Sequence, residues 1–139
     1  MIRYPYQSRS TNDNIPPAPI LQVTLFNPNQ NQERAYKLDA FLDTGADITL
    51  VPLEVISVLR LPLLGKKVSV VGVGGAVTVG FPCRADIQLG ERRLSPPRIV
   101  GCDAAAIGMQ SQMIIGRDIL NQLCVKFDGR RQRFSFEFE

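Results

Sequence analysis

Histidine is absent from this chain of 139 residues, and cysteine is scarce. Without histidine, Ser-His and Cys-His nucleophile pairs and most zinc sites are excluded in one step. The three cysteines, Cys83, Cys102 and Cys124, lie far apart, are odd in number and form no C-x-x-C motif. They indicate neither a disulfide framework nor a metal site, and are typical of small core residues in a reducing compartment. We expect no metal and no organic cofactor.

Long apolar runs are also missing. No run reaches the roughly 18 residues that a transmembrane helix needs. Residues 1–10 contain no apolar segment of the kind found in a signal peptide. We therefore expect no membrane partner and a cytoplasmic location.

An excess of one charge is nearly absent. Lys and Arg total 16 against 13 Asp and Glu, which gives a net charge of +3. The arginines cluster at 92–93 and 130–133 without interleaved aromatic residues, so solvated turns are favoured over nucleic-acid binding. Apolar residues make up 45% of the chain, and this length and composition suit one domain with a moderate core.

Short β-branched and apolar runs between turn residues predict an all-β fold, a closed barrel or sandwich with one short C-terminal helix. The predicted strands cover 20–26, 34–42, 48–51, 67–71, 76–81, 83–89, a segment from 92, 98–100, 113–116, 124–127 and 132–138. Helical spacing is present at 53–59 and 117–123, and 103–112 is predicted to be a loop. Residues 1–19, rich in Pro and Asn, are expected to be a flexible or loosely docked arm before a domain at 20–139.

The most informative stretch is Ala40–Asp47, where an apolar strand runs into Asp43, Thr44 and Gly45. A carboxylate at the end of a buried strand is costly unless it is paired or does chemistry. Asp-Thr-Gly alone is a weak signal, and a turn in which the Asp caps backbone amides is the plain alternative. Haloacid-dehalogenase phosphatases need a second Asp where this chain has Gly45, and the phosphorylated-aspartate ATPases need a Lys that is absent here.

A second feature is the glycine-rich segment Gly72–Gly75, flanked by valines. It predicts a hairpin with a mobile tip. No long helix follows it, so it is not a dinucleotide-binding fingerprint.

Together, Leu42–Asp47, Val70–Gly75 and Ile114–Leu120 occur in the order found in the retroviral-type (retropepsin-like) aspartic protease family. The chain resembles that family over about residues 20 to 138. Asp118 stands where retroviral members often have Asn, so the resemblance is to a cellular or prokaryotic-like member.

The resemblance implies roles for the residues of the Asp43 loop. Asp43 would be the catalytic aspartate, and Thr44 would support the catalytic pair by hydrogen bonding across a dimer axis. Gly45 would let the substrate backbone approach closely. Ala46 and Asp47 would line the subsites and contact the substrate main chain.

The resemblance also implies a flap and a brace. Gly72 to Gly75 would form the flap tip that closes over a peptide, with substrate-binding residues Val71, Gly72, Val73 and Gly74. Arg117 would pair with Asp47 and tie the helix to the active-site loop.

Only one Asp-Thr-Gly is present, and paired carboxylates require two. We therefore expect a homodimeric aspartic endopeptidase that acts on peptide or protein substrates. One alternative is a catalytically silent peptide-binding or dimerisation module of the same fold. Another is a protease that is active only after its N-terminal arm is processed. The terminal stripe of Phe134, Phe136 and Phe138 fits either a core or a dimer interface.

Overall fold

The computed structural model describes residues 2–30, 34–109 and 112–138. Residues 1, 31–33, 110–111 and 139 lie outside this description. The predicted arm, the predicted loop at 103–112 and the predicted domain each include some of these residues, and those parts of the predictions lie outside the described residues.

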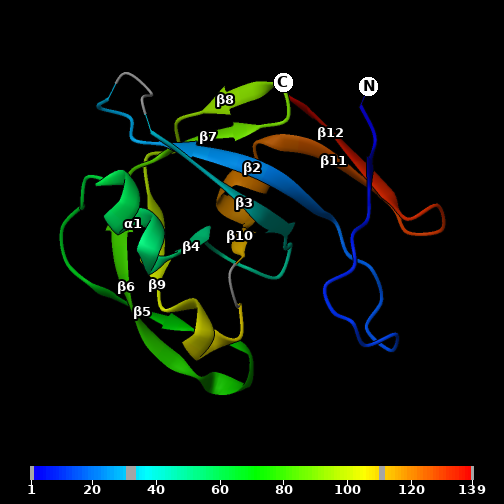
Figure 1. The fold of residues 1–139 in the computed structure, drawn as a ribbon, viewed down its shortest axis with the longest axis horizontal. Helices are drawn as coiled ribbons and strands as arrows, with labels where there is room; N and C mark the ends of the chain where they lie inside the picture. The colour runs from blue at the N-terminus through cyan, green and yellow to red at the C-terminus, as the bar shows by residue number, and fades with distance from the viewer. Residues whose placement is uncertain (1, 31–33, 110–111, 139) are drawn as a thin grey trace.

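Strands dominate the described residues, which confirms the predicted all-β class (Figure 1). The strands are β1 (Tyr4–Pro5), β2 (Ile20–Phe26), β3 (Ala35–Leu42), β4 (Leu50–Pro52), β5 (Val68–Val71), β6 (Val77–Cys83), β7 (Asp86–Leu89), β8 (Arg92–Leu94), β9 (Ile99–Cys102), β10 (Met113–Ile115), β11 (Leu123–Asp128) and β12 (Arg133–Phe138). The helices are α1 (Leu53–Leu59), α2 (Arg117–Leu120) and the 3₁₀ turns η1 (Val73–Gly75) and η2 (Ala104–Ile107).

The strands form two sheets. The larger has the order β5-β6-β9-β4-β10-β3-β2-β7-β8, and the smaller has the order β1-β12-β11. At the centre of the larger sheet, β10 pairs in parallel with β3 and antiparallel with β4. Because β3 and β10 run parallel, their C-terminal ends lie side by side at the same edge of the sheet.

Side-chain alternation explains β3. Leu38, Ala40 and Leu42 are buried in the main core, while Lys37 and Asp39 are exposed, as the predicted strand pattern requires. The same core receives the apolar face of α1. A separate, smaller cluster packs under β5, β9 and η2. Among the described residues, no helix is long and apolar enough to cross a membrane.

The N-terminal segment, expected to be flexible or loosely docked, packs against the smaller sheet in the structure. β1 pairs with β12, and Tyr4 stacks on Phe134 and Phe136 with ring centroids 5.5 and 5.3 Å away. Farther along, the backbones of Gln7 and Ala18 exchange two hydrogen bonds of 2.9 Å. Composition alone does not predict this docking, because it depends on Tyr4 and Tyr6 packing against the aromatic side chains of β12, which is distant in sequence. The domain boundary at residue 19 stays a prediction.

Other boundaries shift from the predicted ones. Helix α2 ends at Leu120 rather than at residue 123, because Leu123 begins β11 and pairs with Phe138. The predicted loop after Asp103 contains η2, whose first turn is capped by the Asp103 carboxylate through the Ala105 N–H at 3.1 Å. The helix α1 was predicted at its observed bounds.

The terminal Phe stripe lies partly in the core of its own chain. Phe134 is 1% exposed, and both edges of β12 are occupied, one by β1 and the other by β11. Phe136 and Phe138 are half-buried.

Replacing Tyr4 by Ala tests the docking of the N-terminal segment. The substitution removes both aromatic stacks and part of the apolar burial, so we expect the free energy of unfolding to fall by about 1–3 kcal/mol. The measurement is urea denaturation followed by circular dichroism. Arg3→Ala, on the exposed neighbouring residue, is the control and should change stability by less than about 0.5 kcal/mol. Equal stability of both variants would mean that the segment is loosely held.

Candidate active site

The candidate site is built where β3 and β10 end side by side. Leu42 is paired with Ile115, and the next backbone N–H, that of Asp43, donates to the Ile115 carbonyl at 2.9 Å. The last ladder bond therefore fixes the first residue of the loop. Asp43 itself is half-buried, and Thr44 after it is exposed.

The loop also fixes the Asp43 carboxylate. The Gly45 N–H donates to Asp43 Oδ1 at 2.9 Å, and the Ala46 N–H donates to the Asp43 carbonyl at 3.2 Å. This is an Asx turn, the local arrangement expected of an Asp before Gly. Within the described part of the chain, Asp43 Oδ2 has no hydrogen-bond partner, so one carboxylate oxygen is held and the other is available. A Cβ at Gly45 would lie 3.2 Å from Oδ1, which crowds the carboxylate.

Arg117 joins the start of α2 to this loop. Its backbone N–H donates to the Ala46 carbonyl at 2.9 Å, and its guanidinium donates to the Thr44 carbonyl at 2.7 Å. The guanidinium also forms an ion pair with Asp47. The Asp47 side chain is 83% exposed, so the ion pair itself adds little stability. Its effect is to orient the guanidinium fork toward the loop carbonyl.

Gly116 permits this close approach. A Cβ there would lie 2.7 Å from the carbonyl carbon and oxygen of Ile48 and 2.9 Å from the Ala46 carbonyl oxygen. These neighbours are backbone atoms that cannot rotate away. The residue is therefore restricted to glycine by the packing of two backbones.

A buried hydrogen-bond network lies behind the loop. The Thr49 hydroxyl donates to Asp118 Oδ1 at 2.7 Å and accepts from the Gly116 N–H at 3.2 Å. The Thr49 N–H donates to Asp118 Oδ2 at 2.9 Å. Thr49 is fully buried, so this network replaces the water that its polar groups lose.

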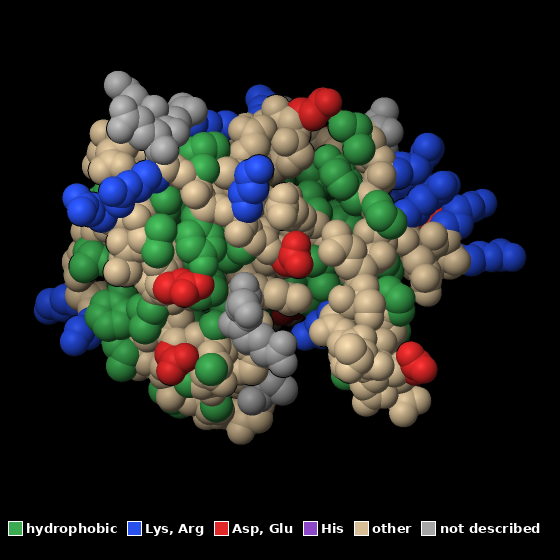
Figure 2. Space-filling model, in the orientation of Figure 1, with side chains coloured by type: hydrophobic (Ala, Val, Ile, Leu, Met, Phe, Trp, Pro, Cys, Tyr) green, Lys and Arg blue, Asp and Glu red, His purple; other side chains and the backbone are tan. Residues whose placement is uncertain are grey.

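A cavity of about 180 Å³ opens beside Asp43. Its described lining comes from the ends of β3 and β10, from the N-terminal segment and from the region after η2: Arg9, Phe41, Asp43, Gly108, Met109, Gln112 and Ile114. A second cavity of about 400 Å³ adjoins it and shares Arg9, Gly108, Met109 and Gln112. In Figure 2 the surface is hollowed between the lobe of the N-terminal segment, at lower right, and the body of the molecule.

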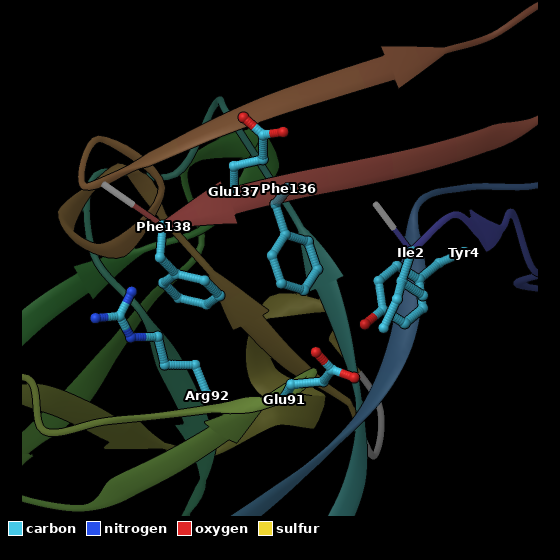
Figure 3. A pocket seen from close by; sticks show the side chains of 7 residues that line it. All are labelled: Ile2, Tyr4, Glu91, Arg92, Phe136, Glu137 and Phe138. Atoms are coloured by element: carbon cyan, nitrogen blue, oxygen red, sulfur yellow. The ribbon is translucent and has the colours of Figure 1, made fainter.

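A larger cavity than the one beside Asp43 lies elsewhere. It measures about 510 Å³ and is framed by β1, β12 and the β7–β8 turn (Figure 3). Its lining shares no residue with the cavity beside Asp43: Ile2, Tyr4, Glu91, Arg92, Phe136, Glu137 and Phe138. The candidate site is therefore identified by the Asp43 loop and not by the size of its cavity.

The predicted flap residues form a hairpin, and no described side chain of this hairpin is among those lining the Asp43 cavity. The Gly72 N–H donates to the Ala76 carbonyl at 2.7 Å, and Gly74 and Gly75 have φ of +81° and +82°. Such φ values strongly favour glycine. Val71 and Val77, opposite each other on β5 and β6, are 67% and 64% exposed. The hairpin lies at the edge of the larger sheet (Figure 1), and these two valines expose apolar surface there.

The two buried cysteines, Cys83 and Cys102, are not suited to act as nucleophiles. Burial raises the pKa of the Cys83 thiol to about 11 and also raises the pKa of Cys102. Both groups are therefore neutral thiols at physiological pH and poor nucleophiles.

The structure brings together Asp43, Thr44, Gly45, Ala46, Asp47 and Arg117, whereas Val71, Gly72 and Gly74 are not among the described residues that line the cavity. The Val73 side chain lies outside the described part of the structure. The sequence did not predict that Thr49 would hydrogen-bond to Asp118. It also did not predict that Phe41, Met109 and Arg9 would line the cavity beside Asp43. Phe41 and Ile114 belong to the apolar stretches that precede Asp43 and Gly116, so the sequence indicated that this part of the chain lies near the site. Arg9 gave none, because it lies in a polar segment without periodicity.

Comparison with known proteins supports the same family. A family model described as aspartyl protease matches residues 28–119. Among solved structures, the chain is similar to the EIAV protease in complex with the inhibitor HBY-793, at 24% sequence identity and a TM-score of 0.53. That match covers 80% of this chain and 92% of the other, and it confirms the retroviral-protease fold. No curated protein matches the chain.

The contact at Gly116 predicts the effect of Gly116→Ala. The added Cβ must push the Ile48 backbone away, so we expect a loss of about 1–3 kcal/mol in the free energy of unfolding. Amide NMR signals of residues 44–47 should move as well. Gly129→Ala, in the β11–β12 turn, is the matched control because its Cβ meets nothing within 4 Å. Unchanged loop signals in Gly116→Ala would contradict the contact.

The network behind the loop predicts a difference between two Thr49 variants. Thr49→Val removes the hydroxyl that joins Gly116 to Asp118 and leaves buried polar groups unpaired, which costs about 1–3 kcal/mol. Thr49→Ser keeps the hydroxyl and should retain more of the stability. Urea unfolding of both variants is the measurement. A Ser variant as unstable as the Val variant would show that the methyl group, not the hydrogen bonds, matters at this position.

Proposed function

Because the chain belongs to the aspartyl protease family, we propose that it is an aspartic endopeptidase that works as a homodimer, with one Asp43 from each subunit. The observation that carries the proposal is the state of the Asp43 carboxylate. One oxygen is held by the Gly45 N–H, the other has no hydrogen-bond partner among the described residues, and Asp43 lines a cavity.

The chemistry requires a pair of carboxylates. Two such groups a few ångströms apart share one proton, because both cannot ionise easily. The ionised one takes a proton from water as that water attacks the peptide carbonyl carbon, and the protonated one donates to the carbonyl oxygen. The tetrahedral intermediate then breaks its C–N bond as the nitrogen gains a proton, which releases an acid and an amine. No metal or organic cofactor takes part.

The second carboxylate has to come from another copy of the chain. Asp43 is the only acidic residue among the described residues that line its cavity. A two-fold axis beside the exposed Thr44 would bring two Asp43 loops together, each held by its own Arg117 and Gly116. The apparent pKa values would then belong to the pair rather than to either residue.

A peptide substrate would be held as an extended strand. Ala46 and Asp47 would contact its main chain on one side, and the hairpin residues Val71, Gly72, Val73 and Gly74 would close over it as a flap. Adding a strand at exposed backbone edges supplies main-chain hydrogen bonds, and side-chain pockets supply selectivity. The exposed valines of the hairpin would then gain an apolar partner.

Asp43→Asn tests the proposal. The amide can neither accept the proton from water nor share one with its counterpart, so we expect kcat/KM to fall by about 10³-fold or more. The assay is cleavage of a broad peptide library between mildly acidic and neutral pH, read by mass spectrometry. Sedimentation and circular dichroism should show that the variant keeps its fold and association state.

Asp39→Asn is the matched control, because Asp39 is an exposed carboxylate on β3, the strand that leads to Asp43. Its activity should equal that of the parent chain. If the parent dimer cuts no peptide, the fold serves as a peptide-binding or dimerisation module instead. If only monomer is present at high concentration, even with a transition-state-mimicking inhibitor, the shared-site mechanism is wrong.

A further inference from the structure

The cleft that ends at Asp43 has the N-terminal segment as one of its walls. The two adjoining cavities share Arg9 on one side and Gly108, Met109 and Gln112 on the other. Beyond Arg9, the larger cavity continues along Ser10, Thr11 and Ile15. A peptide that reaches Asp43 along this cleft therefore passes Arg9.

Arg9 is held in place by its own segment. The Gln7–Ala18 backbone pair closes the base of the loop, and the Ser8 hydroxyl donates to the Ser10 carbonyl at 2.7 Å. The Ser10 hydroxyl in turn accepts from the Asn12 N–H at 3.0 Å. These bonds order the loop on both sides of Arg9.

The guanidinium of Arg9 lies over the Phe41 ring, 4.7 Å from its centroid. This cation–π contact fixes the group above the residue that lies two positions before Asp43. Within the described residues, Arg9 forms no ion pair and no hydrogen bond through its guanidinium, and it is the only cation lining either cavity. Its donors are therefore free to meet an acceptor brought by a ligand.

We propose that Arg9 is a specificity-determining residue that selects an acidic side chain close to the scissile bond of the substrate. This inference rests on the proposed protease function. A carboxylate in this cleft is repelled by the negative charge of Asp43, and Arg9 offsets that repulsion with a planar pair of donors that suits a carboxylate. Phe41, Met109 and Ile114 provide apolar walls for the methylene groups of a Glu side chain.

The test compares peptide pairs that differ only by Glu or Gln at one position near the cleavage site. For the parent chain we expect kcat/KM for the Glu peptide to exceed that for the Gln peptide by about tenfold at one position, the size of a hydrogen bond to a charged group. Arg9→Gln should lower this ratio to one or below, because Asp43 then repels the acidic peptide. Arg9→Lys should keep the ratio above one. Arg3→Gln, an exposed arginine of the same segment, should leave it unchanged.

The pH dependence of the same ratio separates a charge effect from a structural one. Both peptides are cut by the same enzyme, so the titration of the catalytic pair cancels in the ratio. A substrate Glu loses its charge as the pH falls below about 4.3, while Arg stays charged. The parent ratio should therefore decline toward one below that pH, and the Arg9→Gln ratio should not.

The failure of this inference is distinguishable from failure of the protease function. If the parent chain cuts no peptide, the function itself is wrong. If it cuts peptides with no Glu preference at any position, or if Arg9→Gln keeps the preference, Arg9 does not select acidic side chains. If Arg9→Gln lowers all cleavage together with the dimer fraction in sedimentation, Arg9 serves the subunit contact and the specificity proposal is overturned.

Discussion

The candidate site depends on the close packing of two backbones, that of Gly116 at the end of β10 against Ala46 and Ile48 of the Asp43 loop. This contact is possible only without a Cβ. It lets the Arg117 N–H reach the Ala46 carbonyl and the Gly116 N–H reach the Thr49 hydroxyl. The middle and the far end of the loop are thereby attached to the start of α2, and its first residue is bonded to β10. The Asp43 carboxylate is therefore held by the central sheet and is not on a free surface loop.

This rigidity matters for the proposed mechanism, in which each chain would contribute one Asp43 to a shared site. Preorganised carboxylates act on a substrate without reorganising at the moment of reaction, but sharing a proton requires two of them at a fixed distance. In the proposed dimer, a flexible Asp43 loop could not hold such a distance between the two subunits. The ion pair of Arg117 with Asp47 is largely exposed and adds little stability, yet with the Thr44 carbonyl bond it orients the loop at its most exposed part.

Patterns local in sequence were predictable, and contacts between distant segments were not. The alternation in β3, the helix α1 and the Arg117–Asp47 pair follow from periodicity or from a motif, and each is present in the structure. Burial of Phe134 under Tyr4 and the position of Arg9 over Phe41 depend on where a polar N-terminal segment docks, which no periodicity encodes. The hydrogen bond between Thr49 and Asp118 joins residues 69 positions apart. Neither residue type indicates in the sequence which residue it will bond to.

The docking of the N-terminal segment links the stability of the fold to the shape of the cleft. β1 covers one edge of β12, and Tyr4 covers Phe136 and the fully buried Phe134. Releasing the segment by cleavage would expose this aromatic surface and would also remove the wall that carries Arg9. Activation by removal of residues 1–19 would therefore cost the fold part of its core, and a segment that only blocked the site would not need such packing. The physical arrangement favours a segment that belongs to the working form of the protein.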